Sequence, residues 1–212
     1  MKIMKSSNKE KIKENDNKII FITGTPGTGK TTLANLLESK FSKNYNFQIV
    51  KINDLAIENN LIDGVDSDKG YNIVNVQKLD KKLNEVLDSF FNEKDLNDSK
   101  LKISIVEGHL SHLCNCENVD KIIVLRLNPK ILESRLKSRN YSEYKIHENL
   151  EAEALGVCSV EAYQKYGTKV NEIDTSDLSI KEVFKFVEDI IFNKKDFPVG
   201  NIDFMKWILC GY

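Results

Sequence analysis

The chain has 212 residues and a mass of 24.3 kDa, with 41% hydrophobic and 30% charged residues. This length suffices for one well-buried core, and no apolar stretch is long enough to span a bilayer. The formal net charge of −1 excludes a protein built mainly to coat nucleic acid. We therefore expect neither a membrane partner nor direct sequence-specific nucleic-acid binding.

The two ends of the chain are polar. Residues 1–17 are rich in lysine, asparagine and glutamate and lack the apolar core of a signal peptide, which predicts a disordered leader. The four cysteines form no disulfide framework, which is typical of a reducing compartment. We expect the cytoplasm, or the nucleus in a eukaryote. A single domain is predicted over residues 18–193, followed by a tail at 194–212.

The first structural signal is an apolar run at residues 18–23, which is followed by the sequence GTPGTGKT at residues 24–31. This pattern matches GxxxxGK[ST] and predicts a strand, a phosphate-binding loop and a helix. Glycines let several backbone N–H groups point at one anion, and the helix adds the positive end of its dipole. In such a triphosphate site Lys30 reaches the β- and γ-phosphates, and the Thr31 hydroxyl coordinates Mg²⁺.

The next segments continue an alternation of strand and helix. Residues 47–52 alternate in polarity and predict a second strand, which leads into a short helix from Asn53 to Asn60. Residues 61–71 hold two glycines and several aspartates and predict a mobile, polar segment. Apolar residues then recur at helical spacing, which predicts an amphipathic helix from Val76 to about Asn92.

The second half of the chain repeats this alternation. The runs at 101–106 and 121–126 predict strands, and Asn128 caps a helix with Pro129 at its first position. Further helices are predicted at 144–155, 159–166 and 179–193, with a last strand at 169–174. The sequence therefore predicts a three-layer α/β fold with a parallel sheet of about five strands.

Two charged residues stand where predicted strands end. Glu107 and Arg126 each follow an apolar strand, and ligands of parallel sheets bind at the carboxyl ends of the strands. Glu107 in that position can hold Mg²⁺ or its coordinated water. The alternative is a carboxylate that caps the next helix.

Arg135 and Arg139 lie four residues apart and share one helix face, and Arg126 points to the same rim. Three guanidinium groups near a triphosphate would offset the charge on a transferring phosphoryl group. The alternative is a solvated basic face paired with Glu133 or Glu143.

These motifs closely resemble the adenylate kinase isoenzyme 6 family. The matching segments are residues 22–31, 106–109, 124–126, 135–136, 139–142, 145–146, 148–149, 151–153 and 172–175. The likeness spans about residues 19–193, and residues 199–204 look like the tail of archaeal members. The resemblance implies the P-loop nucleoside triphosphate hydrolase fold, with a monophosphate-binding segment at 51–75 and a short lid at 138–148.

The resemblance also implies the residues of the site. Arg139 matches the lid arginine of the family. The residues expected to contact ATP are Gly24, Gly27, Thr28, Gly29, Lys30, Thr31, Thr32 and Arg139, and those expected to take part in catalysis are Lys30, Glu107, His109, Arg126, Arg135 and Arg139. Thr31 and Glu107 would hold Mg²⁺.

His109 has two interpretations. In the resembled family the histidine after the acidic residue is associated with ATP hydrolysis and partner function, so His109 would position water near the γ-phosphate. The alternative is a histidine that starts a helix and packs beside the sheet. His109 also belongs to a run with His112, Cys114 and Cys116, but the spacing fits a metal site poorly.

The resemblance implies a nucleoside monophosphate kinase of adenylate kinase type, which transfers phosphate from ATP to AMP or another nucleoside monophosphate with Mg²⁺ as cofactor and also has ATPase activity. It also implies a role in small-subunit rRNA maturation, with a small-subunit ribosomal protein and the pre-ribosomal particle as partners. The alternative is a regulatory ATPase that gates ribosomal-protein binding without significant kinase activity.

Two further patterns remain. Residues 193–196 spell the guanine-reading NKxD, but no DxxG accompanies it and a GTPase is disfavoured. In the tail, Phe204, Trp207 and Ile208 have helical spacing, which favours docking on the domain over a free contact surface.

Overall fold

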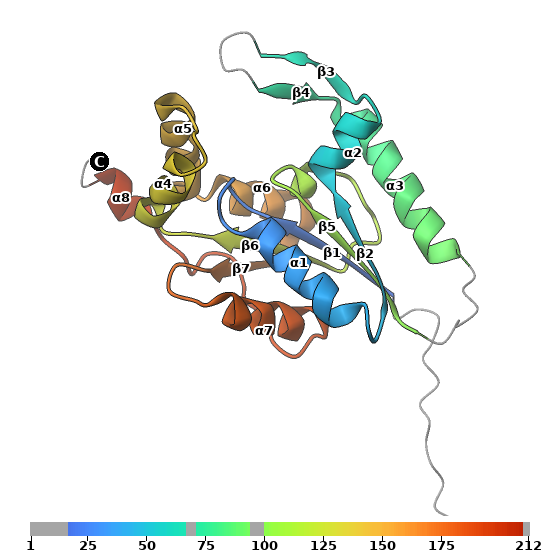
Figure 1. Cartoon of the computed structure of the whole chain (residues 1–212). Coiled ribbons are helices and arrows are strands. Elements are labelled where there is room, and N and C mark those ends of the chain that lie inside the picture. Colours follow the sequence, from blue (N-terminus) through green and yellow to red (C-terminus); the bar gives the residue numbers. More distant parts are fainter. Residues whose placement is uncertain (1–16, 67–70, 94–99, 210–212) are drawn as a thin grey trace, which may run out of the picture.

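The computed structural model describes residues 17–66, 71–93 and 100–209 (Figure 1). A five-stranded parallel sheet lies at its centre, with the strand order β2-β5-β1-β6-β7. The strands are β1 (Lys18–Thr23), β2 (Asn46–Lys51), β5 (Lys102–Glu107), β6 (Lys121–Arg126) and β7 (Val170–Asp174). The predicted three-layer α/β fold with about five parallel strands is confirmed.

The register of the sheet brings the chemically important strand ends together. Ile22 of β1 pairs with Glu107 at the end of β5, and Thr23 of β1 pairs with Val124 of β6. Because all these strands run in the same direction, the loop that follows Thr23 emerges beside Glu107.

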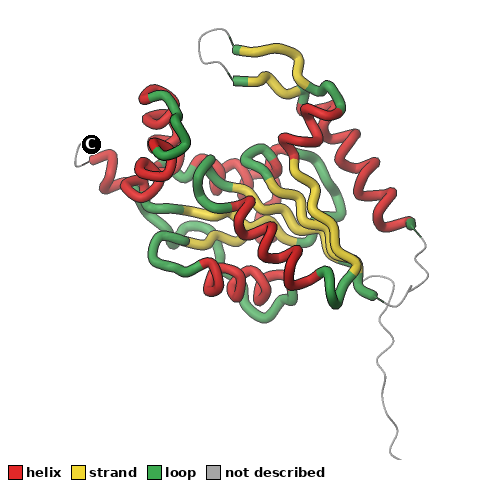
Figure 2. Tube along the Cα trace, in the orientation of Figure 1, coloured by secondary structure: helices red, strands yellow, loops and turns green. Residues whose placement is uncertain are grey.

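Helices cover both faces of the sheet (Figure 2). On one face α1 (Lys30–Phe41) and α7 (Ile180–Ile191) pack against Ile20 and Ile22 of β1. On the other face α3 (Val76–Asn92) and α6 (Val157–Tyr166) pack against Ile19 and Phe21. The two sets alternate along β1 because successive side chains of a strand point to opposite faces. Apolar burial on both faces therefore stabilises this central strand.

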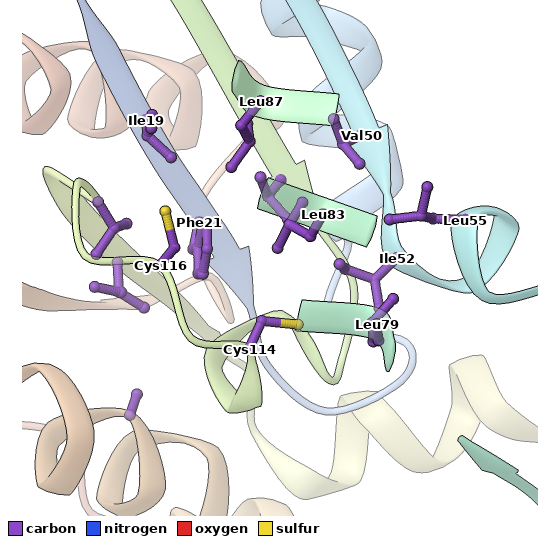
Figure 3. Close-up of a cluster of buried hydrophobic side chains, with 14 of the residues drawn as sticks. Ile19, Phe21, Val50, Ile52, Leu55, Leu79, Leu83, Leu87, Cys114 and Cys116 are labelled. Carbon is purple, nitrogen blue, oxygen red and sulfur yellow. The ribbon is translucent and has the colours of Figure 1, made fainter. Parts of the chain in front are cut away.

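Figure 3 shows the cluster of buried side chains between the sheet and the helices α3 and α6. Leu79, Leu83 and Leu87 recur along α3 at helical spacing and meet the β1 side chains. Cys114 and Cys116 lie in the same cluster and are buried. These two cysteines act here as small apolar core residues.

An arm extends beyond the sheet from the carboxyl end of β2 (Figure 1). It consists of α2 (Ile52–Glu58) and an antiparallel pair, β3 (Ile62–Val65) and β4 (Asn72–Val74). The prediction of a mobile polar segment over residues 61–71 is wrong for the part that the structure describes. Backbone hydrogen bonds, such as the one from Asp66 N to Tyr71 O at 2.8 Å, order this polar sequence as a hairpin. We refer to residues 52–74 as the hairpin arm.

The remaining helices stand at the carboxyl end of β6. Asn128 caps α4 (Pro129–Lys137), as predicted, and α5 (Glu143–Ala154) packs on it around Leu132 and Leu150. Two short 3₁₀ turns, η1 (Ser111–Leu113) and η2 (Gly167–Lys169), complete the element order. In the ranges given above no helix is long and apolar enough to cross a membrane.

The C-terminal tail docks on the domain. Phe197 O accepts a hydrogen bond from Glu172 N of β7 at 2.8 Å, and Pro198 forms a bridge to Asn171. The chain then reaches α8 (Met205–Leu209), where Trp207 packs against the cluster between α4 and α5. The preference for docking over a free contact surface is confirmed for this part of the tail. The predicted leader lies outside the described residues except for Asn17, and the tail's last three residues also lie outside them.

Candidate functional site

The glycine loop between β1 and α1 has the backbone that the sequence pattern requires. Gly24 and Gly27 have φ angles of 131° and 98°. A Cβ on Gly24 would lie 2.4 Å from the carbonyl oxygen of Leu125, and one on Gly27 would lie 2.8 Å from Leu132. The loop is therefore wedged between β6 and α4 at positions that only glycine fits. Helix α1 begins directly after it, at Lys30.

Lys30 turns back into the mouth of the loop. Its Nζ donates hydrogen bonds to the carbonyl oxygens of Gly24 at 2.7 Å and Thr25 at 3.0 Å. The pKa of Lys30 is lowered to about 8, mainly by burial and to a smaller extent by the nearby Arg139, while Glu107 opposes the shift. A buried ammonium with a lowered pKa gains when an anion approaches, because the anion favours its charged form.

Thr31 and Glu107 meet across the site. The Thr31 hydroxyl donates to Glu107 Oε1 at 3.2 Å, and the carboxylate is buried at the end of β5. A hydroxyl and a carboxylate are oxygen donors of the kind that Mg²⁺ takes from proteins, with phosphate oxygens and water completing its coordination. The donor set therefore fits Mg²⁺. The alternative role of Glu107 as a helix cap is not supported, because only the short η1 turn follows and it has no side-chain cap.

Arg135 and Arg139 both lie beside the glycine loop, but the expectation that they share one helix face is wrong, because α4 ends at Lys137 and Arg139 lies in the turn after it. Arg135 Nη1 donates to the carbonyl oxygen of Gly27 at 3.1 Å. Both arginines line a cavity of about 270 Å³. Glu133 pairs with Lys137 at 2.7 Å, so it is not the partner of Arg135 that a solvated basic face would need.

The cavity also has an apolar wall that the sequence analysis did not assign. Leu178, Ile180 and Val183 come from the loop after β7 and the start of α7. Thr28 of the loop and Thr32 at the start of α1 also line the cavity. A planar apolar group fits such a wall while its charged end reaches the loop. The available signal was the position of residues 175–179 directly after a parallel strand.

Arg126 does not lie on the open rim, and this expectation is wrong. Its guanidinium is 3% exposed and donates to Glu153 Oε1 at 2.8 Å and to Glu172 Oε1 at 2.5 Å. Burial lowers the pKa of Arg126, but the two carboxylates outweigh burial and raise it overall. The two buried carboxylates below the loop form charge-assisted hydrogen bonds with the guanidinium, and these bonds are stronger than its hydrogen bonds to water at the rim of the site would be. In this structure Arg126 supports the site from beneath.

His109 lies close to Lys30 on the turn after β5. Burial lowers its pKa to about 4, and the charge of Lys30 and the neighbouring His112 contribute to the shift. The imidazole is therefore neutral at pH 7. His109 does not start a helix, because the only helical turn nearby begins at Ser111.

The other members of the His and Cys run lie apart. His112 Nδ1 is 2.6 Å from Thr23 Oγ1, and its Nε2 is 3.0 Å from Glu161 Oε2. The cysteines of the run lie in the core between α3 and the sheet. Among residues 17–66, 71–93 and 100–209, no group of three or more His, Cys, Asp or Glu side chains could hold a metal ion. The metal alternative for this run is therefore not supported.

The NKxD tetrapeptide lies far from the loop. Asp196 pairs with Lys121 at 2.7 Å, and Lys121 is the first residue of β6. The glycine loop is at the carboxyl end of the same sheet. Residues 193–196 therefore cannot read a base whose phosphates occupy the loop.

Two contacts were not predicted. Thr25 Oγ1 of the loop donates to Glu153 Oε2 at 2.5 Å, and Tyr71 Oη of the hairpin arm donates to Glu148 Oε2 at 2.7 Å. Glu153 could have been singled out, because it lies seven residues after Ile146, on the apolar face of α5. A charge in that position needs a buried partner. Tyr71 carried no such signal, since its partner is 77 residues away.

Comparison with known proteins agrees with this geometry. A family model described as an AAA domain matches residues 20–156. A Methanothermobacter thermautotrophicus protein named "Putative adenylate kinase" is 38% identical over 191 residues, which cover 90% of this chain and 99% of the relative. An Archaeoglobus fulgidus protein of the same name is 37% identical over 192 residues, which cover 89% and 92% of the two chains.

A solved structure supports the fold. The thymidylate kinase from Candida albicans matches with a TM-score of 0.51 and 15% identity, covering 88% of this chain and 96% of that chain. At this identity the likeness concerns the fold alone.

Proposed function

The chain belongs to the family of the archaeal proteins named "Putative adenylate kinase", and we propose that it is a nucleoside monophosphate kinase that converts ATP and AMP to two ADP. One observation carries this proposal. Lys30, the pair of Thr31 and Glu107, and two arginines from α4 and the turn after it all converge on one glycine loop. This is the set of charges that phosphoryl transfer requires.

The donor nucleotide is proposed to bind with its phosphates on the loop and its base against the apolar wall. The backbone N–H groups at the start of α1 and the Lys30 ammonium bind the phosphate oxygens. Arg135 and Arg139 offset the charge that develops on the transferred group. Thr31 and Glu107 would hold Mg²⁺, which supplies further charge neutralisation at the phosphates.

The acceptor needs no general base. The second pKa of a phosphate monoester is near 6, so AMP presents an anionic oxygen at neutral pH. Positioning is then the remaining task, and we assign it to the monophosphate-binding segment at 51–75 and the lid at 138–148. The contact between Tyr71 and Glu148 supports this assignment, since it joins the hairpin arm to the lid helix α5. Closure of both segments would exclude water from the reaction.

We also propose an ATPase activity. The neutral imidazole of His109 beside Lys30 supports it, because a neutral imidazole nitrogen can accept a hydrogen bond from water and position it near the γ-phosphate. A role in maturation of the small ribosomal subunit, with a small-subunit ribosomal protein as partner, rests on the sequence resemblance. In a purely regulatory ATPase, the same site would hydrolyse ATP, and added AMP would not change the rate of ADP formation.

One assay separates these functions. Purified protein is incubated with ATP and Mg²⁺, and ADP formation and phosphate release are followed with AMP, CMP, UMP or GMP as acceptor. We expect AMP to yield ADP well above the rate of phosphate release. ADP formation that AMP leaves unchanged, and that only matches phosphate release, would contradict the kinase and support the regulatory ATPase. The acceptor that gives the highest kcat/KM identifies the preferred monophosphate.

A further inference from the structure

A buried carboxylate from the lid helix is bonded to the phosphate loop. Glu153, near the end of α5, is 1% exposed and accepts a hydrogen bond from Thr25 Oγ1 at 2.5 Å. Its other oxygen accepts from Arg126 Nε at 2.8 Å and from the backbone N of Leu127 at 2.9 Å. The carboxylate therefore joins three segments: the loop, the end of β6 and the end of α5.

Thr25 connects this carboxylate to the inner side of the loop. Its carbonyl oxygen accepts hydrogen bonds from Lys30 Nζ at 3.0 Å and from Thr28 Oγ1 at 3.0 Å. The side chain of Thr25 thus bonds to Glu153, and its carbonyl bonds to Lys30. When Glu153 fixes the side chain, it also fixes the direction of the carbonyl that holds Lys30.

Arg126 balances the charge of this carboxylate. Its Nη2 donates to the backbone oxygen of Glu153 at 2.6 Å, and its Nη1 donates to Glu172 Oε1 at 2.5 Å. The tail encloses the network, because Gly200 N donates to Glu172 Oε2 at 3.1 Å and the Phe204 ring lies 5.3 Å from the guanidinium. Without Arg126, a bare carboxylate would lie beneath an anion-binding loop and repel phosphates.

We infer that Glu153 is a positioning residue of the ATP site, which holds Thr25, and through it Lys30, in the orientation that binds phosphates. The inference rests on the proposed function only in taking ATP as the ligand of the loop. Glu153 lies beneath the loop and touches no reacting atom. Its effect is therefore expected on ATP affinity and not on the affinity for the acceptor.

The test is a double-mutant cycle on the whole chain. Glu153→Gln replaces a charged acceptor with a neutral amide, and Thr25→Val removes the hydroxyl that donates to it. The dissociation constant of a fluorescent ATP analogue is measured for wild type, both single variants and the double variant, without acceptor. Each single variant should weaken binding about tenfold, since a hydrogen bond to a buried charge is lost. The double variant should also weaken it only about tenfold, because both substitutions break one bond.

Two further readouts distinguish positioning from general destabilisation. The KM for AMP should remain at the wild-type value in both single variants while the KM for ATP rises. Glu151→Gln makes the same substitution on the exposed side of α5, where the carboxylate pairs with His147 at 3.7 Å. This control should keep the wild-type affinity for ATP.

The inference is overturned if Glu153→Gln folds and binds the analogue as tightly as wild type. It is also overturned if the single effects multiply to about a hundredfold in the double variant, since the two residues would then act independently. Should Glu153→Gln fail to fold, Thr25→Val decides alone, because it leaves the ion pair between Glu153 and Arg126 intact. In that case an unchanged ATP affinity of Thr25→Val overturns the inference. A wild-type chain that binds ATP without transferring phosphate to AMP contradicts the proposed function and leaves this test intact.

Discussion

The phosphate loop and the hairpin arm are held in place by very different contacts. Beneath the loop, the side chains of Thr25, Arg126 and Glu153 are buried, and Glu153 is bonded to both of the others. The arm reaches the lid helix through the partly exposed Tyr71, whose hydroxyl donates to Glu148 and whose ring lies 4.3 Å from Lys145 Nζ. The loop is thus part of the core, while the arm contacts α5 through a partly exposed side chain.

This difference corresponds to what each region has to do. A hydrogen bond to a buried charge contributes roughly 1.5–3 kcal/mol, so the loop cannot rearrange without losing several such contributions. The partly exposed hydrogen bond from Tyr71 contributes about 0.5–1.5 kcal/mol, so thermal motion can separate the arm from α5. A loop that binds the same anion in every cycle gains from being fixed, and segments that admit substrate gain from opening easily.

We call the phosphate loop and the buried side chains beneath it the fixed region. The largest effect is expected at Lys30, at the centre of this region. Lys30→Ala should lower kcat/KM for ATP roughly 10³-fold, because it removes the charge that the loop holds for the phosphates. Steady-state kinetics with a fixed acceptor concentration measures this. Lys102→Ala is the matched control, since Lys102 is also buried and donates to the backbone oxygen of Phe90 at 2.9 Å, at the other end of the sheet. A Lys30→Ala variant with wild-type kinetics would contradict the proposed function and also the distinction between a fixed loop and a loosely held arm.

Arg126→Met tests whether the support beneath the loop is structural. The substitution leaves Glu153 and Glu172 buried without their guanidinium, which should lower the free energy of unfolding by about 3–5 kcal/mol. Urea denaturation followed by circular dichroism measures the change. If Arg126 instead contacted phosphate at the rim, stability would stay within about 0.5 kcal/mol of wild type, as for most surface substitutions, and only turnover would fall.

The fixed region was also the more predictable from sequence, because local patterns specify it. Three short patterns of neighbouring residues define it: the glycine motif, the apolar run of β1 and the acidic end of β5. The register of the parallel sheet then brings these patterns together. Arg126 shows where this reasoning fails. Its position at a strand end was correct, but two carboxylates on distant elements determine the direction of its guanidinium.

The arm was less predictable because its order comes from pairing between two short segments. The polar residues between Leu61 and Tyr71 have weak strand propensity, and backbone hydrogen bonds across the hairpin outweigh it. The contact of Tyr71 with α5 depends on how near the hairpin arm and α5 come to each other in the folded protein. Neither composition nor periodicity contains that information.

The pH dependence of ATP binding sharpens the description of the fixed region. The pKa of Lys30 is lowered from 10.5 to about 8, so the ammonium loses its proton as the pH rises through about 8. Because phosphate binds the charged form, ATP affinity should be about tenfold weaker at pH 9 than at pH 7. Titrations of the fluorescent analogue across this range measure it. A Lys30→Ala variant should show only the pH dependence of the nucleotide, and an equal dependence in both proteins would contradict the assignment.

Protein stability should respond in the opposite direction. Between about pH 8 and 10.5 the unfolded chain binds a proton at Lys30 that the folded chain does not. The contribution of Lys30 to the free energy of unfolding therefore rises with pH in this window, while ATP affinity falls. Urea denaturation at pH 7 and pH 9, compared with Lys30→Ala, isolates this contribution.

The smallest effect is expected where the arm meets the lid. Tyr71→Phe removes the hydroxyl that donates to Glu148 and keeps the ring beside Lys145, so roughly 0.5–1.5 kcal/mol of closure is lost. The KM for AMP should rise about two- to tenfold, with ATP affinity unchanged, because the loop beneath is untouched. Tyr163→Phe on the exposed side of α6 is the control. A loss as large as that of Lys30→Ala would mean that the arm is as rigidly built as the loop, and the distinction between the two regions would be wrong.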